Sequence, residues 1–212
     1  MKIEIAVATV HGRAYYEFVN ELFRKRLPFL SLKPWDNIPL GIKVVLTTNE
    51  ESRQISHPHV LSLEQKPNPK FVIDEAILII RGKQNYKKVV IGVDPGKTCG
   101  IAILGDNIVL ETLISTNIED TLHLIIDSLN RFPAEVKIVR VGDGTPDYTK
   151  MLVRSLCTHL AENVSLELVR EAGTSQLATK SVNRRVLRDV VSAIKIAGRT
   201  GRTFSRRIIN NI

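Results

Sequence analysis

The sequence predicts an α/β protein with a small N-terminal α/β domain, residues 1–84, and a larger C-terminal domain, residues 85–212. Short apolar runs typical of strands alternate with segments whose apolar residues recur at helical spacing. The basic stretch 81–88, which contains Gly82, separates two such series and marks the expected boundary. The C-terminal series predicts a mixed five-stranded sheet with helices on both faces.

The N-terminal domain is expected to alternate strands and helices. Its apolar runs predict strands at residues 3–9, 29–32, 42–48 and 60–63. Helical spacing predicts helices at residues 14–25 and 71–80, and the polar segment 49–56 is expected to form one or two helical turns. No motif here indicates a chemistry. His11-Gly12-Arg13, between the first strand and the first helix, fits either an anion-binding turn or an ordinary turn.

The C-terminal domain shows a clearer pattern. Strands are expected at residues 88–93, 99–104, 108–114, 136–141 and 164–169, and helices at residues 117–130, 147–161 and 183–198. Gly105-Asp106-Asn107 predicts a hairpin between the second and third strands. Asn117 is expected to cap the first helix. Glu111, in the third strand, is expected to face solvent or a neighbouring side chain.

The order of these segments predicts their topology. The first three strands follow one another closely, so they are expected to run antiparallel. The fourth and fifth strands each follow a helix, so they are expected to be parallel, right-handed crossovers. This order is the ribonuclease-H-like topology.

Composition favours a soluble, cytoplasmic protein with a polyanionic partner. The 212 residues carry a net charge of +8 and a pI of about 9.6, which favours nucleic acid first and an anionic membrane surface second. Aromatic residues make up only 5% of the chain, which argues against base-stacking platforms for single strands. No apolar run approaches the roughly 20 residues of a membrane-spanning helix. Cys99 and Cys157 lack metal-ligand spacing and are expected to be reduced core thiols.

Four acids in separate segments are expected to meet in space. Asp94, Asp143 and Glu171 follow the first, fourth and fifth strands, whose carboxyl ends share one edge of the sheet if the strands are parallel. Asp189 lies on the apolar stripe of the closing helix and is expected to face the sheet. The alternatives are turn chemistry for Asp94 and Asp143, a solvated Glu171, and an ion pair of Asp189 with a nearby arginine.

A divalent cation would relieve the repulsion between converging carboxylates. Two Mg²⁺ or Mn²⁺ ions about 4 Å apart can clamp a phosphodiester, one activating water and the other stabilising the leaving oxygen. The sequence therefore predicts Asp94, Asp143 and Asp189 as metal ligands, with Glu171 orienting the attacking water.

Two stretches of the C-terminal domain resemble a known family. VVIGVDPGKTCGIAIL, residues 89–104, is similar to the first-strand signature of RuvC-type Holliday junction resolvases and their YqgF relatives, and REAGTSQLATKSVNRRVLRDVVSAIKIAG, residues 170–198, resembles the YqgF pattern. The resemblance covers about residues 88–198. It implies a ribonuclease-H-like nuclease that hydrolyses phosphodiesters of branched DNA or precursor ribosomal RNA with a divalent metal.

The same resemblance assigns roles to the acids. It makes Asp94 the ligand on the first strand, Asp189 the ligand on the closing helix, and Glu171 the acid of the loop. Asp143 stands where resolvases place a glutamate. The loop reads Arg-Glu-Ala in this chain, where the family pattern begins Asp-Glu-Arg.

Basic residues near these acids are expected to contact phosphates. They are Lys97, Arg184, Arg185 and Arg188. A solvated basic helix face is the alternative for each arginine. The Gly- and Arg-rich tail from residue 199 is expected to become ordered only on nucleic acid. Cutting two strands of a branched substrate symmetrically would require a homodimer.

Three functions remain open from the sequence. The first is a metal-dependent nuclease acting on structured DNA or RNA. The second is a non-catalytic nucleic-acid-binding protein of the same fold. The third is a phosphotransferase of the actin and sugar-kinase superfamily, because residues 94–98 fit Asp-x-Gly-x-Thr. Only one copy of that motif is present, however, and those enzymes use two such domains.

Overall fold

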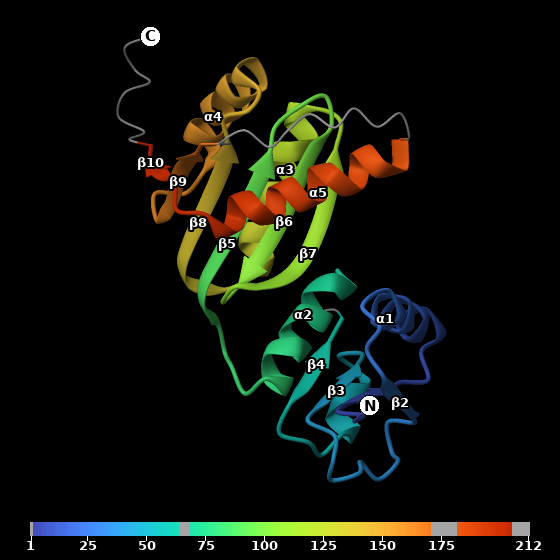
Figure 1. Cartoon of the computed structure of the whole chain (residues 1–212). Helices are drawn as coiled ribbons and strands as arrows, with labels where there is room; N and C mark the ends of the chain where they lie inside the picture. Colours follow the sequence, from blue (N-terminus) through green and yellow to red (C-terminus); the bar gives the residue numbers. More distant parts are fainter. Residues whose placement is uncertain (1, 64–67, 171–181, 205–212) are drawn as a thin grey trace. The chain divides into compact units, whose positions relative to one another are not determined.

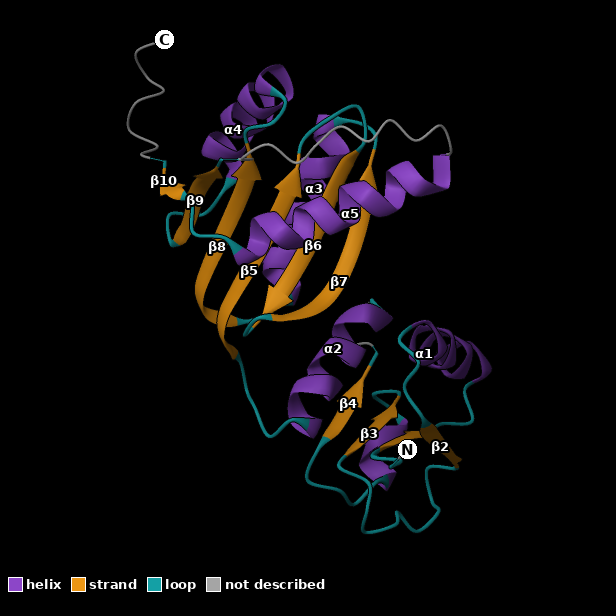
Figure 2. Ribbon diagram, viewed as in Figure 1, coloured by secondary structure: helices purple, strands orange, loops and turns teal. Residues whose placement is uncertain are grey.

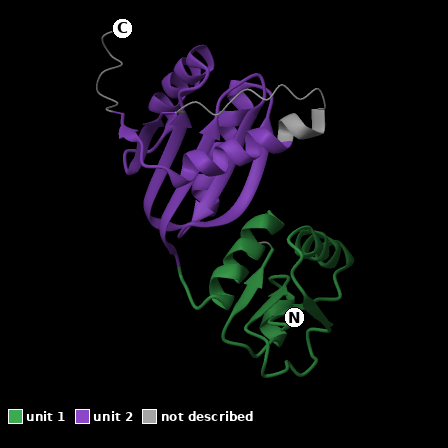
Figure 3. Ribbon diagram, viewed as in Figure 1, with its two compact units in different colours: residues 1–84 green, residues 85–212 purple. Residues whose placement is uncertain are grey.

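The computed structural model describes residues 2–63, 68–170 and 182–204, with only the backbone described for residues 182–186. The chain divides into two compact units, Met1–Gln84 and Asn85–Ile212 (Figure 3). We call them unit 1 and unit 2 and describe each by itself.

Unit 1 is a parallel α/β sheet (Figure 1). Its elements are β1 (Ile5–Ala8), α1 (Gly12–Arg24), β2 (Phe29–Leu32), β3 (Val44–Thr47), the 3₁₀ helix η1 (Glu51–Gln54), β4 (Val60–Ser62) and α2 (Pro69–Ile80). The strand order is β2-β1-β3-β4, and every neighbouring pair is parallel. The central strands β1 and β3 are buried along their whole length because both faces of the sheet are covered.

The two faces of this sheet have separate apolar cores. Ile5, Val7 and Val44 pack with Phe18 of α1 and Ile73 of α2. On the other face, the cluster consists of Ala6, Ala8, Ile42 and Val45, with Leu30, Leu32, Ile38 and Ile55 packed against it. An ion pair of 2.7 Å between Lys25 and Asp74 adds a polar link at the α1 side of the first core.

Side chains and a glycine define the helix ends of unit 1. His11 caps α1, since its Nδ1 accepts a hydrogen bond from the Ala14 backbone N–H at 3.3 Å. Asn68 caps α2. Gly82, with a φ of +66°, ends α2 in a Schellman motif: its N–H donates to Ile79, and the Lys83 N–H donates to Leu78. The domain boundary predicted at residues 81–88 therefore begins where α2 ends.

Unit 2 is a mixed sheet with helices on both faces. Its elements are β5 (Tyr86–Asp94), β6 (Cys99–Gly105), β7 (Ile108–Ser115), α3 (Ile118–Arg131), β8 (Ala134–Gly142), α4 (Pro146–His159), β9 (Val164–Val169), α5 (Val182–Gly198) and β10 (Arg202–Thr203). The strand order is β10-β9-β8-β5-β6-β7. As predicted, β5, β6 and β7 are antiparallel neighbours, and β8 and β9 run parallel to β5.

Two sequence signals for local structure are confirmed. Asp106 and Asn107 have φ values of 49° and 66°, the backbone of a type I′ hairpin turn between β6 and β7. Asn117 caps α3 by accepting a hydrogen bond from the Asp120 N–H at 2.7 Å.

The end of the described chain differs from expectation. The prediction of five strands is wrong, because β10 pairs antiparallel with β9 and makes the sheet six-stranded. Residues 199–204 are part of this ordered edge, so the expected absence of fixed structure is wrong for them. The close approach needs Gly201, where a Cβ atom would lie 2.8 Å from the Glu167 Cβ.

Helix α5 crosses one face of the sheet, with α3 and α4 on the other (Figure 2). It lies unusually close to β5 and β6 because glycines stand beneath it. A Cβ atom on Gly92 would lie 2.2 Å from the Ala193 carbonyl oxygen, and one on Gly100 would lie 2.2 Å from that of Asp189. Ala193 and Ala197 complete the contact from the helix side.

Two buried ion pairs cross unit 2. Glu111 of β7 pairs with Arg131 of α3, and both side chains are almost fully buried. Of the two alternatives expected for Glu111, solvent or a neighbouring side chain, the structure shows the second, and the neighbour is the buried Arg131. On the α5 side, Arg140 donates to Glu167 at 2.8 Å and to the Ala197 carbonyl at 2.6 Å, which joins β8, β9 and α5.

In the part of the chain that the structure describes, none of the helices combines the length and apolarity that a bilayer crossing requires.

Candidate functional site

The candidate site lies at the carboxyl edge of the parallel strands in unit 2. Asp94 ends β5, Asp143 follows β8, and Arg170 follows β9. Two hydrogen bonds tie these strand ends together: the Asp143 N–H donates to Val169 at 3.2 Å, and the Thr145 hydroxyl donates to the Pro95 carbonyl. Ligands of open α/β sheets bind at this kind of edge.

Asp94 and Asp189 share the face of the sheet that α5 covers. Side chains alternate along β5, and Val90 and Gly92 face α5, so Asp94 also points to that side. Its cross-strand partner is Gly100, and the Asp189 carbonyl lies directly over Gly100. Asp189 precedes Ala193 by four residues, so the two residues lie on the same face of α5. Both aspartates are half-buried.

Asp143 is placed differently. It is exposed and follows Gly142, the last residue of β8. Glu171 lies outside the described residues. Within the described ranges, no three His, Cys, Asp or Glu side chains form a group that could hold a metal ion. The structure thus brings the segments of Asp94 and Asp189 together and does not gather the three described aspartates into one metal-binding group.

The predicted phosphate contacts are only partly described. Lys97 is exposed in the turn between β5 and β6, and Arg188 is exposed on α5, one residue before Asp189. The side chains of Arg184 and Arg185 lie outside the described residues. Lys97 and Arg188 are therefore close in sequence to Asp94 and Asp189, and both side chains are accessible to a ligand.

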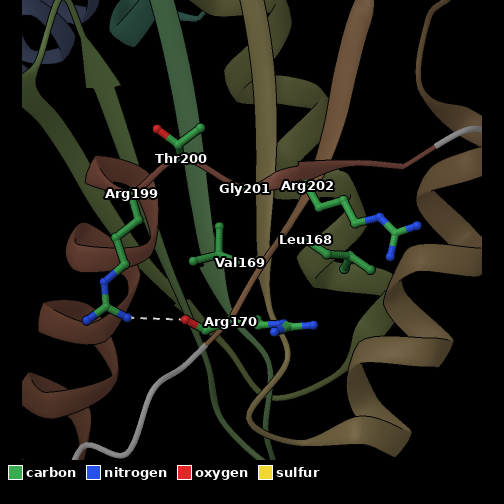
Figure 4. Close-up of a pocket in the computed structure, with 7 residues that line it drawn as sticks. All are labelled: Leu168, Val169, Arg170, Arg199, Thr200, Gly201 and Arg202. Carbon is green, nitrogen blue, oxygen red and sulfur yellow. Dashed lines mark hydrogen bonds between the residues drawn. The ribbon is translucent and has the colours of Figure 1, made fainter.

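A pocket of about 590 Å³ opens at the outer side of the same edge, between the end of β9 and the segment that leads from α5 into β10. Its charged side chains are Arg170, Arg199 and Arg202, and all three are exposed. Figure 4 shows Arg199 and Arg202 on either side of Thr200 and Gly201, with the Arg199 guanidinium donating to the Arg170 carbonyl at 3.4 Å.

Glu167, a described acid of β9 close to this pocket, is already engaged. Glu167 accepts hydrogen bonds from Arg140 at 2.8 Å and from the Gly201 N–H at 3.2 Å. Its charge is therefore balanced inside the sheet and does not neutralise the pocket arginines.

Unit 1 has a second carboxyl edge, at the point between β1 and β3 where the strand order reverses. Glu51 occupies it. One carboxylate oxygen accepts hydrogen bonds from the Thr9 hydroxyl and, at 2.8 Å, from the Thr48 hydroxyl; the other accepts from the Val10 N–H at 2.9 Å. This carboxylate is hydrogen-bonded within its own unit, and we place the candidate site in unit 2.

These hydrogen bonds also set the ionisation of Glu51. Burial alone would raise the pKa of its carboxyl, but the bonds from Thr9, the Val10 backbone and Thr48 favour the charged form and outweigh burial. The pKa of Glu51 therefore lies below its ordinary value.

Comparison with known protein families finds a match in unit 1. Residues 4–80 match the family model of a response regulator receiver-like domain. No curated protein matches the sequence. The resemblance to the RuvC and YqgF families is therefore wrong as an assignment: the matching family is a different one and lies in the other unit.

Packing explains why the motif misled. Gly92 and Gly100, which give residues 89–104 their signature-like pattern, are both required by the close contact of α5. Glycines in a strand pair under a closely packed helix are explained by this packing alone.

Sequence reasoning placed Arg199 and Arg202 in a tail expected to become ordered on nucleic acid, but it missed the pocket that they line with Arg170. It also missed the hydrogen bonds of Glu51. The arginines were part of a tail expected to lack structure, and Gly201 was the one available signal for a close contact. For Glu51, the only signal was the flanking Thr47 and Thr48 at the end of a buried strand.

Proposed function

We propose that unit 2 is a ribonuclease-H-like domain that hydrolyses phosphodiester bonds of structured nucleic acid with Mg²⁺ or Mn²⁺. The topology supports the fold. Across the sheet, β7, β6, β5, β8 and β9 are the third, second, first, fourth and fifth strands of unit 2 in chain order. Strands β5, β8 and β9 are parallel to one another, and β6 runs antiparallel to them. A closing helix, α5, then packs on the face that carries Asp94.

One observation carries the functional part of this proposal. The Asp189 backbone packs on Gly100, and Gly100 is the strand partner of Asp94. Two carboxylates from segments about a hundred residues apart thus occupy neighbouring positions on one face. A chain that builds such a contact through a glycine positions the two acids for a shared ligand.

The donor set suits a hard divalent cation. Mg²⁺ prefers oxygen ligands and is commonly held by one or two carboxylates together with waters and substrate phosphates. Asp94 and Asp189 would supply those carboxylates. When bound, the ion would lower the pKa of a water and stabilise charge on the phosphodiester. A second ion would need further acids, for which Asp143 and Glu171 are the sequence candidates.

Other residues would hold the substrate. Lys97, in the turn after Asp94, and Arg188, beside Asp189, are exposed cations that can neutralise phosphates flanking the scissile bond. Such contacts position the strand and carry no base specificity.

A cleavage assay tests the proposal. The full chain is incubated, in the presence of Mn²⁺, with each of three substrates in turn: four-way DNA junctions, DNA duplex and structured RNA. We expect cleavage of at least one substrate, abolished by EDTA and reduced at least a hundredfold by Asp94→Asn or Asp189→Asn. Asp127→Asn, at an exposed position on α3, is the control and should cleave like the wild type. Cleavage that survives both Asp94→Asn and Asp189→Asn refutes the assignment.

A non-catalytic nucleic-acid-binding protein is the second candidate. It is favoured by the finding that the described residues contain no group of three potential metal ligands. In that case the chain would bind the same substrates with no divalent-dependent cleavage, and Asp94→Asn and Asp189→Asn would leave binding unchanged or tighter, because a repulsive charge is lost.

A further inference from the structure

We propose that the pocket lined by Arg170, Arg199 and Arg202, called here the arginine pocket, is a phosphate subsite for the sugar–phosphate backbone of a nucleic acid. The inference rests on the proposed function of unit 2 and extends it by naming a second contact with the same polymer. It concerns binding, and therefore does not depend on a metal.

The chemistry of the pocket suits phosphate. Three arginines line a pocket of about 590 Å³, with the Arg170 and Arg202 side chains on one side and that of Arg199 on the other (Figure 4). Guanidinium forks match the geometry of phosphate oxygens. No ion pair among the described residues involves these three side chains, and the nearby Glu167 is engaged by Arg140 and the Gly201 N–H. Arg170 and Arg202 lie on the same side of the β9–β10 pair, and a phosphate bound between these two cations would reduce their repulsion.

The pocket depends on a specific backbone contact. A Cβ atom at position 201 would lie 2.9 Å from the Leu168 carbonyl oxygen and 3.1 Å from a Val169 methyl group. Gly201 therefore allows β10 to lie close against β9, and this pairing places Arg199 and Arg202 beside Arg170.

The location links the pocket to the aspartates. Arg170 follows β9, which neighbours β8, which in turn neighbours β5 with Asp94 at its end. Two strand spacings of about 4.8 Å separate β9 from β5. The arginine pocket therefore lies roughly 10 Å or more along the sheet from the end of β5, a distance that one nucleic-acid strand can span.

A polymer fits this site better than a small free anion. Sites for small ligands bury most of the ligand surface, whereas all three arginines here are exposed. Residues 85–212 contain 18 Lys and Arg against 13 Asp and Glu, a net charge of +5 that adds long-range attraction for a polyanion.

Binding of fluorescein-labelled DNA duplex and RNA hairpin by the full chain tests the proposal. Fluorescence anisotropy is measured in EDTA between 50 and 200 mM KCl for the wild type, for Arg170→Ala, Arg199→Ala and Arg202→Ala, and for the double variant R199E/R202E. Each alanine variant should weaken binding equally for different sequences and reduce the slope of log K against log[salt] by about 1. The double variant should lose most of the binding.

A matched control separates a local effect from net charge. Arg154→Glu changes an exposed arginine of α4, outside the pocket, and should retain the salt slope of the wild type. If the wild type binds and the pocket variants behave like Arg154→Glu, the inference is overturned and the proposed function is left intact. Absence of nucleic-acid binding by the wild type refutes the proposed function itself.

A competition arm distinguishes the backbone from free phosphate. Inorganic phosphate or AMP at about 1–5 mM, the order of the Kd of a weak small-anion site, should displace little of the duplex. Displacement that disappears in Arg199→Ala and Arg202→Ala would show a small-anion site and overturn the assignment to a polymer backbone.

Discussion

The carboxylates of this chain fall into two groups at the scale of single residues. Glu51, Glu111 and Glu167 are buried or nearly so and are hydrogen-bonded inside their own unit. Asp94, at the end of β5, and Asp189, on α5, are half-buried. A buried, hydrogen-bonded acid stabilises the fold, and an acid at the end of a parallel strand stands where open α/β sheets bind ligands.

Glu51 makes the stability of unit 1 dependent on pH. Its pKa in the folded chain is lowered, so its contribution is complete above the ordinary carboxyl pKa and is lost as the pH falls through the lowered value. We expect the midpoint of urea unfolding, followed by fluorescence of Trp35 in unit 1, to fall between pH 5 and pH 3, roughly the window below the ordinary value.

The variant Glu51→Gln should remove part of this dependence and destabilise unit 1 by about 1.5–3 kcal/mol at pH 7, the range for hydrogen bonds to a charged group. Glu50→Gln, one residue earlier and exposed, is the control and should follow the wild type. An unchanged pH profile for Glu51→Gln would contradict this account.

The pair of Glu111 and Arg131 gives a second test. Arg131→Met would leave the Glu111 carboxylate buried without its cation, and we expect unit 2 to lose about 3–5 kcal/mol of unfolding free energy. Circular dichroism during urea unfolding measures this. The double variant E111L/R131M should recover most of the loss, and a single variant as stable as the wild type would show that the pair is dispensable.

Glycines determine the position of a helix at the scale of elements. Gly92 lies against Ala193 and Ala197, and Gly100 lies against Asp189, so α5 can approach the sheet at backbone distance. This contact holds Asp189 on the face of Asp94. The same two glycines therefore serve the fold and the candidate site.

Alanine at these positions should displace α5. For Gly92→Ala we expect a loss of about 1–3 kcal/mol, the range for overpacking a tight core, because the added methyl group meets backbone atoms. Gly198→Ala, where no atom lies within 4 Å of the added Cβ, should be neutral or slightly stabilising. Equal urea midpoints for Gly92→Ala and Gly198→Ala would contradict the packing described here.

Most strands and helices could be predicted from sequence periodicity, because each has one apolar face or is buried throughout. The hairpin at Asp106 and Asn107 and the cap at Asn117 depend on local backbone chemistry and were predictable for that reason. The short strand β10 was not, because its two residues are exposed and its pairing depends on the distant strand β9.

The site was less predictable than the fold. Sequence order indicated which acids end parallel strands, but it could not determine whether Asp143 joins Asp94 and Asp189. That depends on the course of the loop after β8, which the Thr145 hydroxyl ties to Pro95. The pocket arginines come from two segments that are adjacent only after β10 pairs with β9.

The whole molecule consists of two units with separate cores. We expect chains 1–84 and 85–212, expressed separately, each to unfold cooperatively, and we expect nucleic-acid binding to reside in 85–212. Urea unfolding and anisotropy measure these outcomes. A chain 85–212 that folds but binds no nucleic acid, while the full chain does bind, would contradict the assignment of the interface to unit 2.

The most direct test of the central claim is Mn²⁺ binding, measured by electron paramagnetic resonance on the full chain without nucleic acid. If Asp94 and Asp189 hold one ion together, Asp94→Asn, Asp189→Asn and the double variant should all lose the same bound Mn²⁺, since removing either ligand removes the site. Wild-type Mn²⁺ binding that persists in Asp189→Asn would contradict a site shared by the end of β5 and α5.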